Sequence, residues 1–372
     1  MKNIRILLLG DYSNCHRTLA TGLQQLGCDV TLASDGSKWM NCERHIDISR
    51  RPGKIGGMIH CVTMHYLLRG ILSGFDIVAV HDPNFTTLRP ERLRQLFDKL
   101  RLKNGKVFLT AMSTDIAYLD MVSPPDSPLR YSEWFIGDKP SRMNLANPEA
   151  WDDWHNPDLM DYQNYFYDHI DGAVSILYEY HLGMVKRLGK ERAAYAGIPV
   201  DLDRFPFMPM TDIYEKIKIF LGRDRTRQLM KGSDYLEQAA RIVAARAPRK
   251  REFILVENRP FNEFIRLLTD SHLVLDQIYS YTPATTALMA MAYGRNVVSG
   301  AEPEYYDFID EHDNRPIINA PLTLEELVDT IEQTVSHPES FQLRGLRSRE
   351  FVERHNDAKI VAKRFLDFWT AI

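Results

Sequence analysis

Two basic residues follow an apolar run in the C-terminal half of the chain. Arg223 comes directly after the run at 217–221, and Lys231 with Gly232 follows a few residues later. Arginine grips phosphate oxygens with two parallel N–H donors, and lysine adds a point charge. A diphosphate needs such neutralisation, above all when it departs with its charge. We therefore interpret Arg223 and Lys231 as diphosphate ligands with a catalytic role, and an ordinary solvated loop is the alternative.

A second phosphate-binding element is predicted where a helix begins. Thr282 can cap a helix, Pro283 suits its first turn, and 284–293 has high helix propensity. Backbone N–H groups and the positive dipole end of such a helix suit phosphate, although many well-capped buried helices bind nothing. The hydroxyl groups of Thr282 and Thr285 are expected to add donors at the same phosphate site.

Polar residues also follow the predicted strands of the N-terminal half. His81 stands after the run at 77–80, Asp115 stands shortly after 107–110, and Ser13 lies on the loop after the first strand. The carboxyl ends of parallel strands meet at one edge of a sheet, where ligands bind. We interpret His81 and Asp115 as candidate catalytic residues that position or deprotonate a hydroxyl group of a substrate, and Ser13 as a ligand contact. For the nearby His16, a role at a helix start is favoured over catalysis.

The elements that must position these residues alternate between apolar strands and amphipathic helices. We predict one domain over 1–198 and a second over 199–350, and the proline-containing linker 197–210 interrupts the pattern between them. It predicts an α/β protein with two Rossmann-like, doubly wound parallel-sheet domains facing a cleft. The helix expected within 351–372 can pack back toward the first domain. The aromatic and proline-rich stretch 118–167 is either a surface excursion or a lid that binds an acceptor.

Composition excludes several classes of protein. The 372 residues are 44% apolar and 26% charged with a net charge of −4, which is typical of a soluble globular protein and gives no case for nucleic-acid binding. Apolar runs are too short to span a bilayer, and no signal-peptide pattern precedes the first strand. No two of the four cysteines have zinc-type spacing. We expect a cytoplasmic protein without a metal or cofactor, and the sequence does not indicate an oligomeric state.

One amphipathic stretch allows a further interpretation. Residues 50–74 combine Arg50, Arg51, Lys54 and Arg69 with many apolar side chains. A core-facing helix with a solvated basic rim is the favoured interpretation. The alternative is a basic amphipathic surface that contacts the anionic inner face of the cell membrane peripherally.

The same residues resemble a known family. Gly222-Arg223 and Lys231-Gly232, the linker residues 197–201 with Phe205, and the stretch 289–298 are similar to motifs of GT-B glycosyltransferases of the large retaining family 4. The resemblance implies a GT-B fold and transfer of a sugar from a nucleotide diphosphate sugar to a hydroxyl acceptor. It also implies retention at the anomeric carbon, no metal, and a carbohydrate or lipid-linked acceptor, as in surface polysaccharide or glycan assembly.

The sequence departs from that family at its paired glutamates. Tyr281 and Met289 stand where the two glutamates fall, and Thr282-Pro283-Ala284 replaces a Gly-Phe-Gly. The nearest polar candidates for the ribose and sugar contacts are Asp276, Gln277, Glu302 and Glu304, and Tyr281 is expected at the same nucleotide site. Two alternatives therefore stay open. Besides a transferase, the chain could be a degenerate GT-B protein that binds a ligand or partner without catalysis, or a sugar-nucleotide epimerase of the same architecture.

Overall fold

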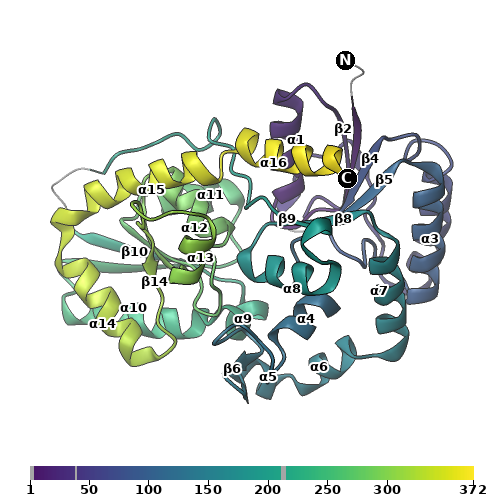
Figure 1. Ribbon diagram of the computed structural model, residues 1–372. Helices are drawn as coiled ribbons and strands as arrows, with labels where there is room; N and C mark the ends of the chain where they lie inside the picture. Colours follow the sequence, from purple (N-terminus) through teal and green to yellow (C-terminus); the bar gives the residue numbers. More distant parts are fainter. Residues whose placement is uncertain (1–3, 38–39, 211–214) are drawn as a thin grey trace. The chain divides into compact units, whose positions relative to one another are not determined.

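The computed structural model describes residues 4–37, 40–210 and 215–372 and divides the chain into two compact units (Figure 1). The first unit contains residues 1–126, 147–199 and 358–372, and the second contains 127–146 and 200–357. Each unit is built on a parallel sheet, so the two predicted α/β domains are confirmed. Among the described residues, every helix is too short or too polar to cross a bilayer.

The sheet of the first unit has the strand order β3-β2-β1-β4-β5-β8-β9, and every pairing is parallel. The bounds are Arg5–Leu9 for β1, Asp29–Ser34 for β2, Ile46–Asp47 for β3, Ile77–Val80 for β4, Lys106–Ala111 for β5, Gly172–Ser175 for β8 and Ala193–Tyr195 for β9. Strands that are covered on both faces read as continuous apolar runs, as 77–80 does. The order reverses beside β1, between β2 and β4.

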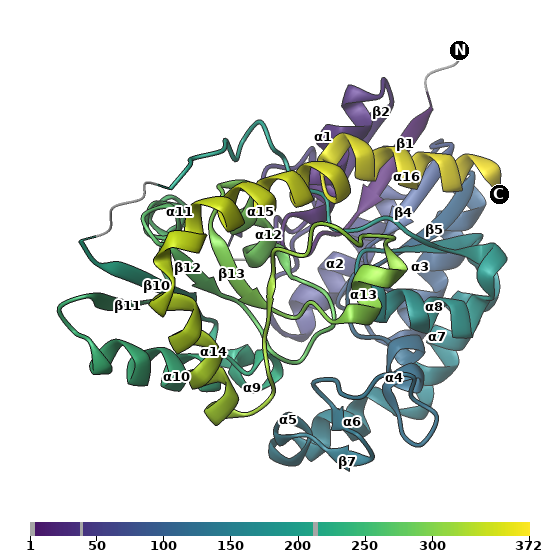
Figure 2. The same cartoon turned by 60° about the vertical axis from the view of Figure 1, so that its left-hand side comes forward.

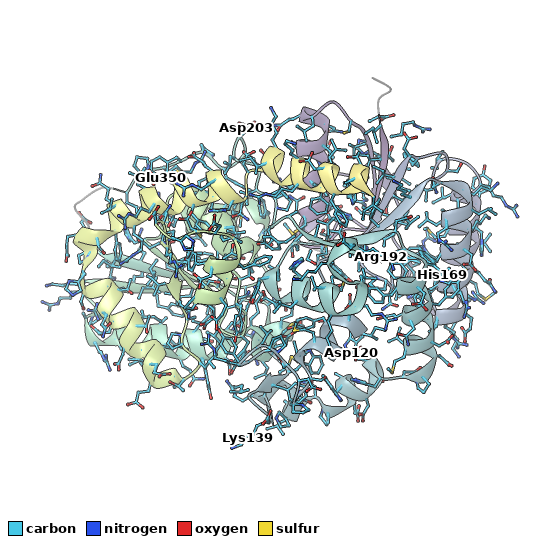
Figure 3. The ribbon with its side chains drawn as sticks, viewed as in Figure 1. Asp120, Lys139, His169, Arg192, Asp203 and Glu350 are labelled. Carbon is cyan, nitrogen blue, oxygen red and sulfur yellow. The ribbon has the colours of Figure 1, made fainter. Side chains whose placement is uncertain are left out.

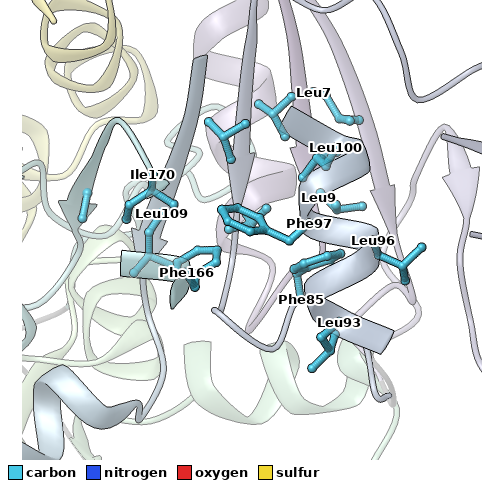
Figure 4. Close-up of a cluster of buried hydrophobic side chains, with 14 of the residues drawn as sticks. Leu7, Leu9, Phe85, Leu93, Leu96, Phe97, Leu100, Leu109, Phe166 and Ile170 are labelled. Atoms are coloured by element: carbon cyan, nitrogen blue, oxygen red, sulfur yellow. The ribbon is translucent and has the colours of Figure 1, made fainter. Parts of the chain in front are cut away.

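Helices cover both faces of this sheet. Leu7 and Leu9 point into a core with side chains of α2 (Gly53–Leu67), α3 (Pro90–Lys103) and α7 (Pro157–His169), as Figure 4 shows for α3 and α7. Phe108 points to the other face, where its ring lies 6.0 Å from that of Trp369. The remaining helices of the unit are α1 (Cys15–Gln25), α4 (Ile116–Val122), α6 (Pro148–Trp154), α8 (Tyr178–Leu188) and α16 (Ala358–Ala371).

Helix α16 returns the chain to the first unit (Figures 1 and 2). It packs along α1, and Gly22 allows the close approach, since a Cβ there would lie 2.1 Å from the carbonyl oxygen of Ala358. Arg364 donates from Nη1 to the carbonyl of Ala196 at 2.8 Å. The predicted helix segment 351–372 is split, because residues up to His355 complete α15 (Phe341–His355) of the second unit.

The sheet of the second unit has the order β11-β10-β12-β13-β14, again parallel throughout. The strands are β10 (Ile217–Gly222), β11 (Arg251–Val256), β12 (Leu273–Leu275), β13 (Asn296–Ser299) and β14 (Ile318–Asn319). One face packs on α10 (Ser233–Arg246) and α14 (Leu324–Ser336), which lie side by side in Figure 2. On the other face, the rings of Phe220 and Phe264 in α11 (Phe261–Thr269) lie 5.2 Å apart.

Residues 127–146, here called the strap, group with the second unit although they interrupt the first in sequence. The strap contains the hairpin β6 (Phe135–Ile136) and β7 (Lys139–Pro140), followed by α5 (Arg142–Ala146). Lys139, labelled in Figure 3, belongs to this hairpin. The sequence pattern predicted these residues to be part of the first domain, because chain order gives no sign that an excursion packs elsewhere.

We expect Gly22→Ala to destabilise the first unit by about 1–3 kcal/mol. Alanine normally favours a helix over glycine, but here its methyl group would force α16 away from α1. Urea unfolding would measure the loss. Gly70→Ala is the matched control, because nothing lies within 4 Å of the added atom there. Equal stability of both variants would contradict the proposed packing role.

Candidate functional site

Both sheets place polar side chains where the strand order reverses. In open parallel sheets, ligands bind beyond the carboxyl ends of the strands at this switch point. In the second unit the strand order reverses between β10 and β12, and in the first unit it reverses between β1 and β4. The residues after these strands were predicted as nucleotide and acceptor ligands, respectively.

Lys231 lies at the switch point of the second unit. It ends the short helix α9 (Gln228–Lys231), and its Nζ lies 3.1 Å from Oδ1 of Asp276, which follows β12. Its carbonyl accepts the backbone N–H of Ile278 at 2.9 Å. Gly232 has a φ of +67° and lacks a Cβ that would lie 2.2 Å from Cγ1 of Ile278. A Lys-Gly pair is therefore what allows this ammonium group to reach the loop after β12.

Asp276 organises the surroundings of that ammonium group. Its side chain is buried, and its Oδ2 accepts from the backbone N–H of Ala284 at 3.2 Å and from Ser299 Oγ at 3.1 Å. A carboxylate with three donors links the end of α9, the start of a helix and the end of β13. Sequence reasoning named Asp276 only as a nearby polar residue, because a single Asp after a strand is common.

The helix after this loop is α12 (Thr285–Ala292), and it begins later than predicted. Thr282 was expected as its cap, but the N-cap residue is Ala284, which makes no side-chain capping bond. Ser280 explains the difference, since its hydroxyl accepts from the Thr282 N–H at 3.3 Å and donates to the Thr282 carbonyl at 2.9 Å. The N–H groups of the first turn of α12, from Thr285 onward, have no acceptor within the helix.

Gln277 and Gly300 fix the shape of the same loop. Gln277 donates from Nε2 to the Thr282 carbonyl at 3.3 Å. A Cβ on Gly300 would lie 1.8 Å from the carbonyl oxygen of Ser280, so glycine allows the loop to cross the end of β13. The predicted ligands Gln277 and Thr282 thus form hydrogen bonds with other residues of the loop, while Thr285 is the first residue of α12.

Arg223 forms its ion pairs on the β11 side of β10, whereas Lys231 lies on the β12 side. Its Nε donates to Glu257 after β11 at 2.6 Å, and its Nη1 pairs with Glu237 of α10. Only 9% of the side chain is exposed. The Arg225 guanidinium and that of Arg223 hold the pKa of Glu257 down, at about 2. Sequence reasoning treated Arg223 and Lys231 as one cationic pair, but each has carboxylate partners of its own.

Tyr281 and Glu302 hold the strap. The Tyr281 hydroxyl accepts the backbone N–H of Arg130 at 2.7 Å, and its ring lies 4.9 Å from the ring of Tyr131. Glu302 accepts from the Tyr131 hydroxyl at 2.6 Å and from Asn319 Nδ2 at 2.9 Å, and it pairs with the Arg130 guanidinium. Two predicted nucleotide ligands therefore have structural partners that lie far away in sequence.

Arg142 adds a cation that sequence reasoning missed. It lies in α5 of the strap, pairs with Asp234 and stacks over the ring of Tyr235 at 3.8 Å. Its charge also acts on Tyr279 in the loop after β12. Helix α5 contacts α9, which ends at Lys231. An arginine in an irregular aromatic segment gives no sequence sign of such a position.

His81 lies at the switch point of the first unit. Its ring is buried and packs edge-on against Tyr12, with ring centroids 4.6 Å apart. Its Nδ1 lies 3.2 Å from the Leu9 carbonyl. A Cβ on Gly10 would lie 1.8 Å from that nitrogen, so the glycine after β1 makes room for the imidazole. His81 thus follows β4 directly, as chain order predicted, and its imidazole lies against the end of β1.

Asp82, the next residue, is a buried carboxyl group with a strongly raised pKa. Its carboxylate accepts from the Ser113 hydroxyl and, at 2.6 Å, from the Asn84 N–H. Burial raises its pKa from 3.8 to about 7, although the Ser113 and Asn84 hydrogen bonds oppose the shift. A group that gains and loses a proton near neutral pH suits general acid–base chemistry. The sequence pattern did not single out Asp82 as a site residue.

Asp115 has a structural position instead. It caps α4, accepting the Tyr118 N–H at 2.9 Å, and its other oxygen accepts the Tyr167 hydroxyl at 2.6 Å. Burial raises its pKa to about 6, against the Tyr167 hydrogen bond. Because both oxygens are engaged in the interior, the geometry favours helix capping over the predicted role as an acceptor base.

The loop after β1 is held by a buried network. His16 Nδ1 lies 2.7 Å from the Gly10 carbonyl and Nε2 lies 2.8 Å from Thr110 Oγ1, so Nδ1 donates and Nε2 accepts. Burial lowers its pKa to about 3, which keeps the ring neutral. The predicted helix-start role of His16 fits this position. Ser13 and Asn14 have φ of +52° and +65°, an uncommon conformation that places Ser13 at the start of α1.

The comparisons with known proteins come from structure alone. No family model matches the sequence, and no curated protein matches it. The fold is similar to Anabaena HepE in complex with UDP and glucose, at a TM-score of 0.61 and 12% identity over 100% of both chains. It is also similar to sucrose-phosphate synthase from Thermosynechococcus elongatus, at 0.62 and 14% over 99% of both.

A third similar structure is a putative UDP-N-acetylglucosamine 2-epimerase from Listeria monocytogenes. The TM-score is 0.54 and the identity 12%, over 98% of this chain and 95% of that chain. Together these likenesses show the GT-B fold, with two parallel-sheet α/β domains. Within the described residues, no group of three or more His, Cys, Asp or Glu side chains is arranged to hold a metal ion.

We expect Asp82→Asn to stabilise the protein more at about pH 8 than at about pH 4, by about 2–4 kcal/mol. The folded-state pKa is raised, so the wild-type carboxyl contributes stability below pH 4 that is lost as the pH rises to about 7. The amide stays neutral throughout. Urea unfolding at both pH values measures the difference, and Asp138→Asn at an exposed position is the control. An equal effect at both pH values would contradict burial of the charge.

Proposed function

We propose that the chain is a glycosyltransferase that moves a sugar from a nucleoside diphosphate sugar to a hydroxyl acceptor. The observation that carries the proposal is the position of Lys231 beside the loop that leads into α12, at the switch point of a GT-B sheet. The HepE structure holds UDP and glucose, and a uridine diphosphate donor is therefore the first candidate.

The donor residues would act mainly by electrostatics. The bond between the anomeric carbon and the phosphate oxygen breaks, and the nucleoside diphosphate leaves with an added negative charge. Lys231 and the free N–H groups at the start of α12 would stabilise that charge, and preorganised donors of this kind often contribute more to catalysis than any other effect. Asp276 fixes the ammonium group through the 3.1 Å contact, so little reorganisation is needed.

Arg223, Tyr281 and Glu302 receive a supporting role in this proposal. Arg223 is bound by Glu237 and Glu257, and a diphosphate would have to share it with those carboxylates. Tyr281 and Glu302 hold the strap, which brings the Arg142 guanidinium to the loop after β12. The strap thus adds positive charge in a chain that lacks the two glutamates of the resembling family.

On the acceptor side we propose His81 and Asp82. The acceptor hydroxyl attacks the anomeric carbon, and its proton passes to a neighbouring base or to the departing phosphate oxygen. Asp82 has the raised pKa that a base at neutral pH needs, and His81 is placed to orient the hydroxyl. Retention, metal independence and a role in polysaccharide or glycan assembly follow from the resemblance alone and belong to this proposal, as does a cytoplasmic location.

Two other functions have specific observations in their favour. Tyr281 and Met289 replace the family glutamates, and the cations have internal carboxylate partners, which favours a protein that binds a nucleotide without catalysis. The likeness to a putative 2-epimerase favours conversion of the sugar on its nucleotide. Both alternatives use the same nucleotide site, so the substrate requirement must separate them.

We expect Lys231→Met to weaken uridine diphosphate binding about tenfold to hundredfold, because one charge-assisted contact is lost. Isothermal titration measures the affinity. Lys231 is a better target than Arg223, since removing Arg223 would leave Glu237 and Glu257 without their shared partner.

The double variant Lys231→Met, Asp276→Asn is the control for folding. It removes both charges of the 3.1 Å pair, so no unpaired buried carboxylate remains. We expect it to fold as the wild type does and to bind as weakly as Lys231→Met. Wild-type affinity in either variant would refute the assignment of Lys231.

Incubation with uridine diphosphate sugars separates the three functions. A transferase should release uridine diphosphate faster when a hydroxyl acceptor is added, and Asp82→Asn should slow that reaction most at about pH 8, where the wild-type carboxyl is ionised. Nuclear magnetic resonance follows the sugar. Conversion of the sugar without an acceptor would indicate an epimerase, and binding without turnover would indicate a binding protein.

A further inference from the structure

Helix α2 of the first unit is apolar on both sides. One side is buried and contains Gly56, Gly57, His60, Cys61 and Met64. The other side is exposed and contains Ile55, Met58, Ile59, Val62 and Tyr66, which we call the α2 face. Surface helices normally turn charged or polar side chains outward. The α2 face therefore lacks the composition of an ordinary solvated helix surface.

The exposure of this face is large. Ile55, Val62 and Tyr66 are 75%, 70% and 75% exposed, and Met58 and Ile59 are more than half exposed. Ile71, in the turn after the helix, is 58% exposed. These side chains follow helical spacing, so they form one continuous stripe and are not scattered single residues. A contiguous apolar patch of this kind marks an interaction surface.

The segment that carries the α2 face has only basic charged side chains. Residues 48–75 contain Arg50, Arg51, Lys54 and Arg69 but no Asp or Glu, although the chain as a whole has a net charge of −4. All four basic residues are exposed. A helical apolar stripe with Lys and Arg at its edges is typical of segments that lie in the interface of an anionic bilayer.

The fold holds the α2 face close to the acceptor edge of the first sheet. Helix α2 follows β3, whose parallel direction brings Pro52 and Gly53 to the carboxyl edge of the strands. His60, at the middle of the helix, pairs with Thr86 of the loop after β4, which also carries His81 and Asp82. A surface that meets the α2 face would therefore lie near the predicted acceptor residues.

We propose that the α2 face docks the protein on an anionic membrane surface. The apolar side chains would enter the boundary between headgroups and acyl chains, and the four basic residues would contact lipid phosphates. A second copy of the chain fits less well. In a two-fold dimer the same patch faces itself, so the basic residues of both copies would meet without an acidic partner.

Flotation with lipid vesicles tests this proposal. We expect the full chain to bind vesicles of pure phosphatidylglycerol at low salt, to bind pure phosphatidylcholine weakly, and to dissociate as salt is added. Ile59→Glu with Val62→Glu should weaken binding more than tenfold. Arg50→Glu with Arg51→Glu should do the same, since each basic residue near such a surface contributes about fivefold.

Matched controls exist on the second unit. Leu343→Glu with Leu346→Glu has the same three-residue spacing on exposed positions of α15, and Arg249→Glu with Lys250→Glu is an exposed adjacent pair. Both should bind as the wild type does. Lys231→Met should also keep full vesicle binding, so failure of the proposed catalytic function would not be mistaken for failure of docking.

Three results would overturn the proposal. They are absence of wild-type binding to phosphatidylglycerol at low salt, unchanged binding of both α2 variants, or equal loss in the control variants. Sedimentation without lipid tests the alternative that the α2 face forms a dimer. If the wild type is a dimer and the double variant Ile59→Glu, Val62→Glu is a monomer, the α2 face would instead bind a second copy of the chain.

Discussion

A buried carboxylate holds a fixed positive charge at the end of the second parallel sheet. Asp276 binds the Lys231 ammonium group, a backbone N–H before α12 and the Ser299 hydroxyl. Because burying a charge is costly without such partners, the loop after β12, the glycine at 232 and the start of α12 must all fit around this one group. The same constraint leaves an ammonium group and free helix N–H groups at one place, which is a suitable environment for an incoming phosphate.

The first unit also places buried polar side chains at its strand ends. Gly10 makes room for His81, and the buried network of His16, Gly10 and Thr110 keeps the loop after β1 in shape. Asp82 lies at the same edge with a pKa near neutrality, which makes its charge sensitive to small changes in surroundings. The carboxyl edge thus holds a lysine ammonium group in the second unit and a carboxyl group of raised pKa in the first.

The sequence predicted the fold more completely than the site. Apolar runs such as 77–80 and 273–275 identified buried parallel strands, and chain order correctly placed His81 just beyond a strand end. Contacts between residues that are far apart in the sequence could not be predicted from these local patterns. The partners of Arg223, the capping role of Asp115 and the anchoring of the strap at Glu302 depend on which strands become neighbours. Local spacing carries no information about those pairings.

The order of segments along the chain has a consequence for biosynthesis. Helix α16 covers one face of the first sheet, yet it follows residue 357, after the whole second unit. The strap emerges from the ribosome before Asp234, Tyr281 and Glu302, to which it binds. Domains usually fold in the order in which they are made. Here the unit begun first is finished last, and a nascent chain must keep apolar strand surface shielded until its final helix arrives.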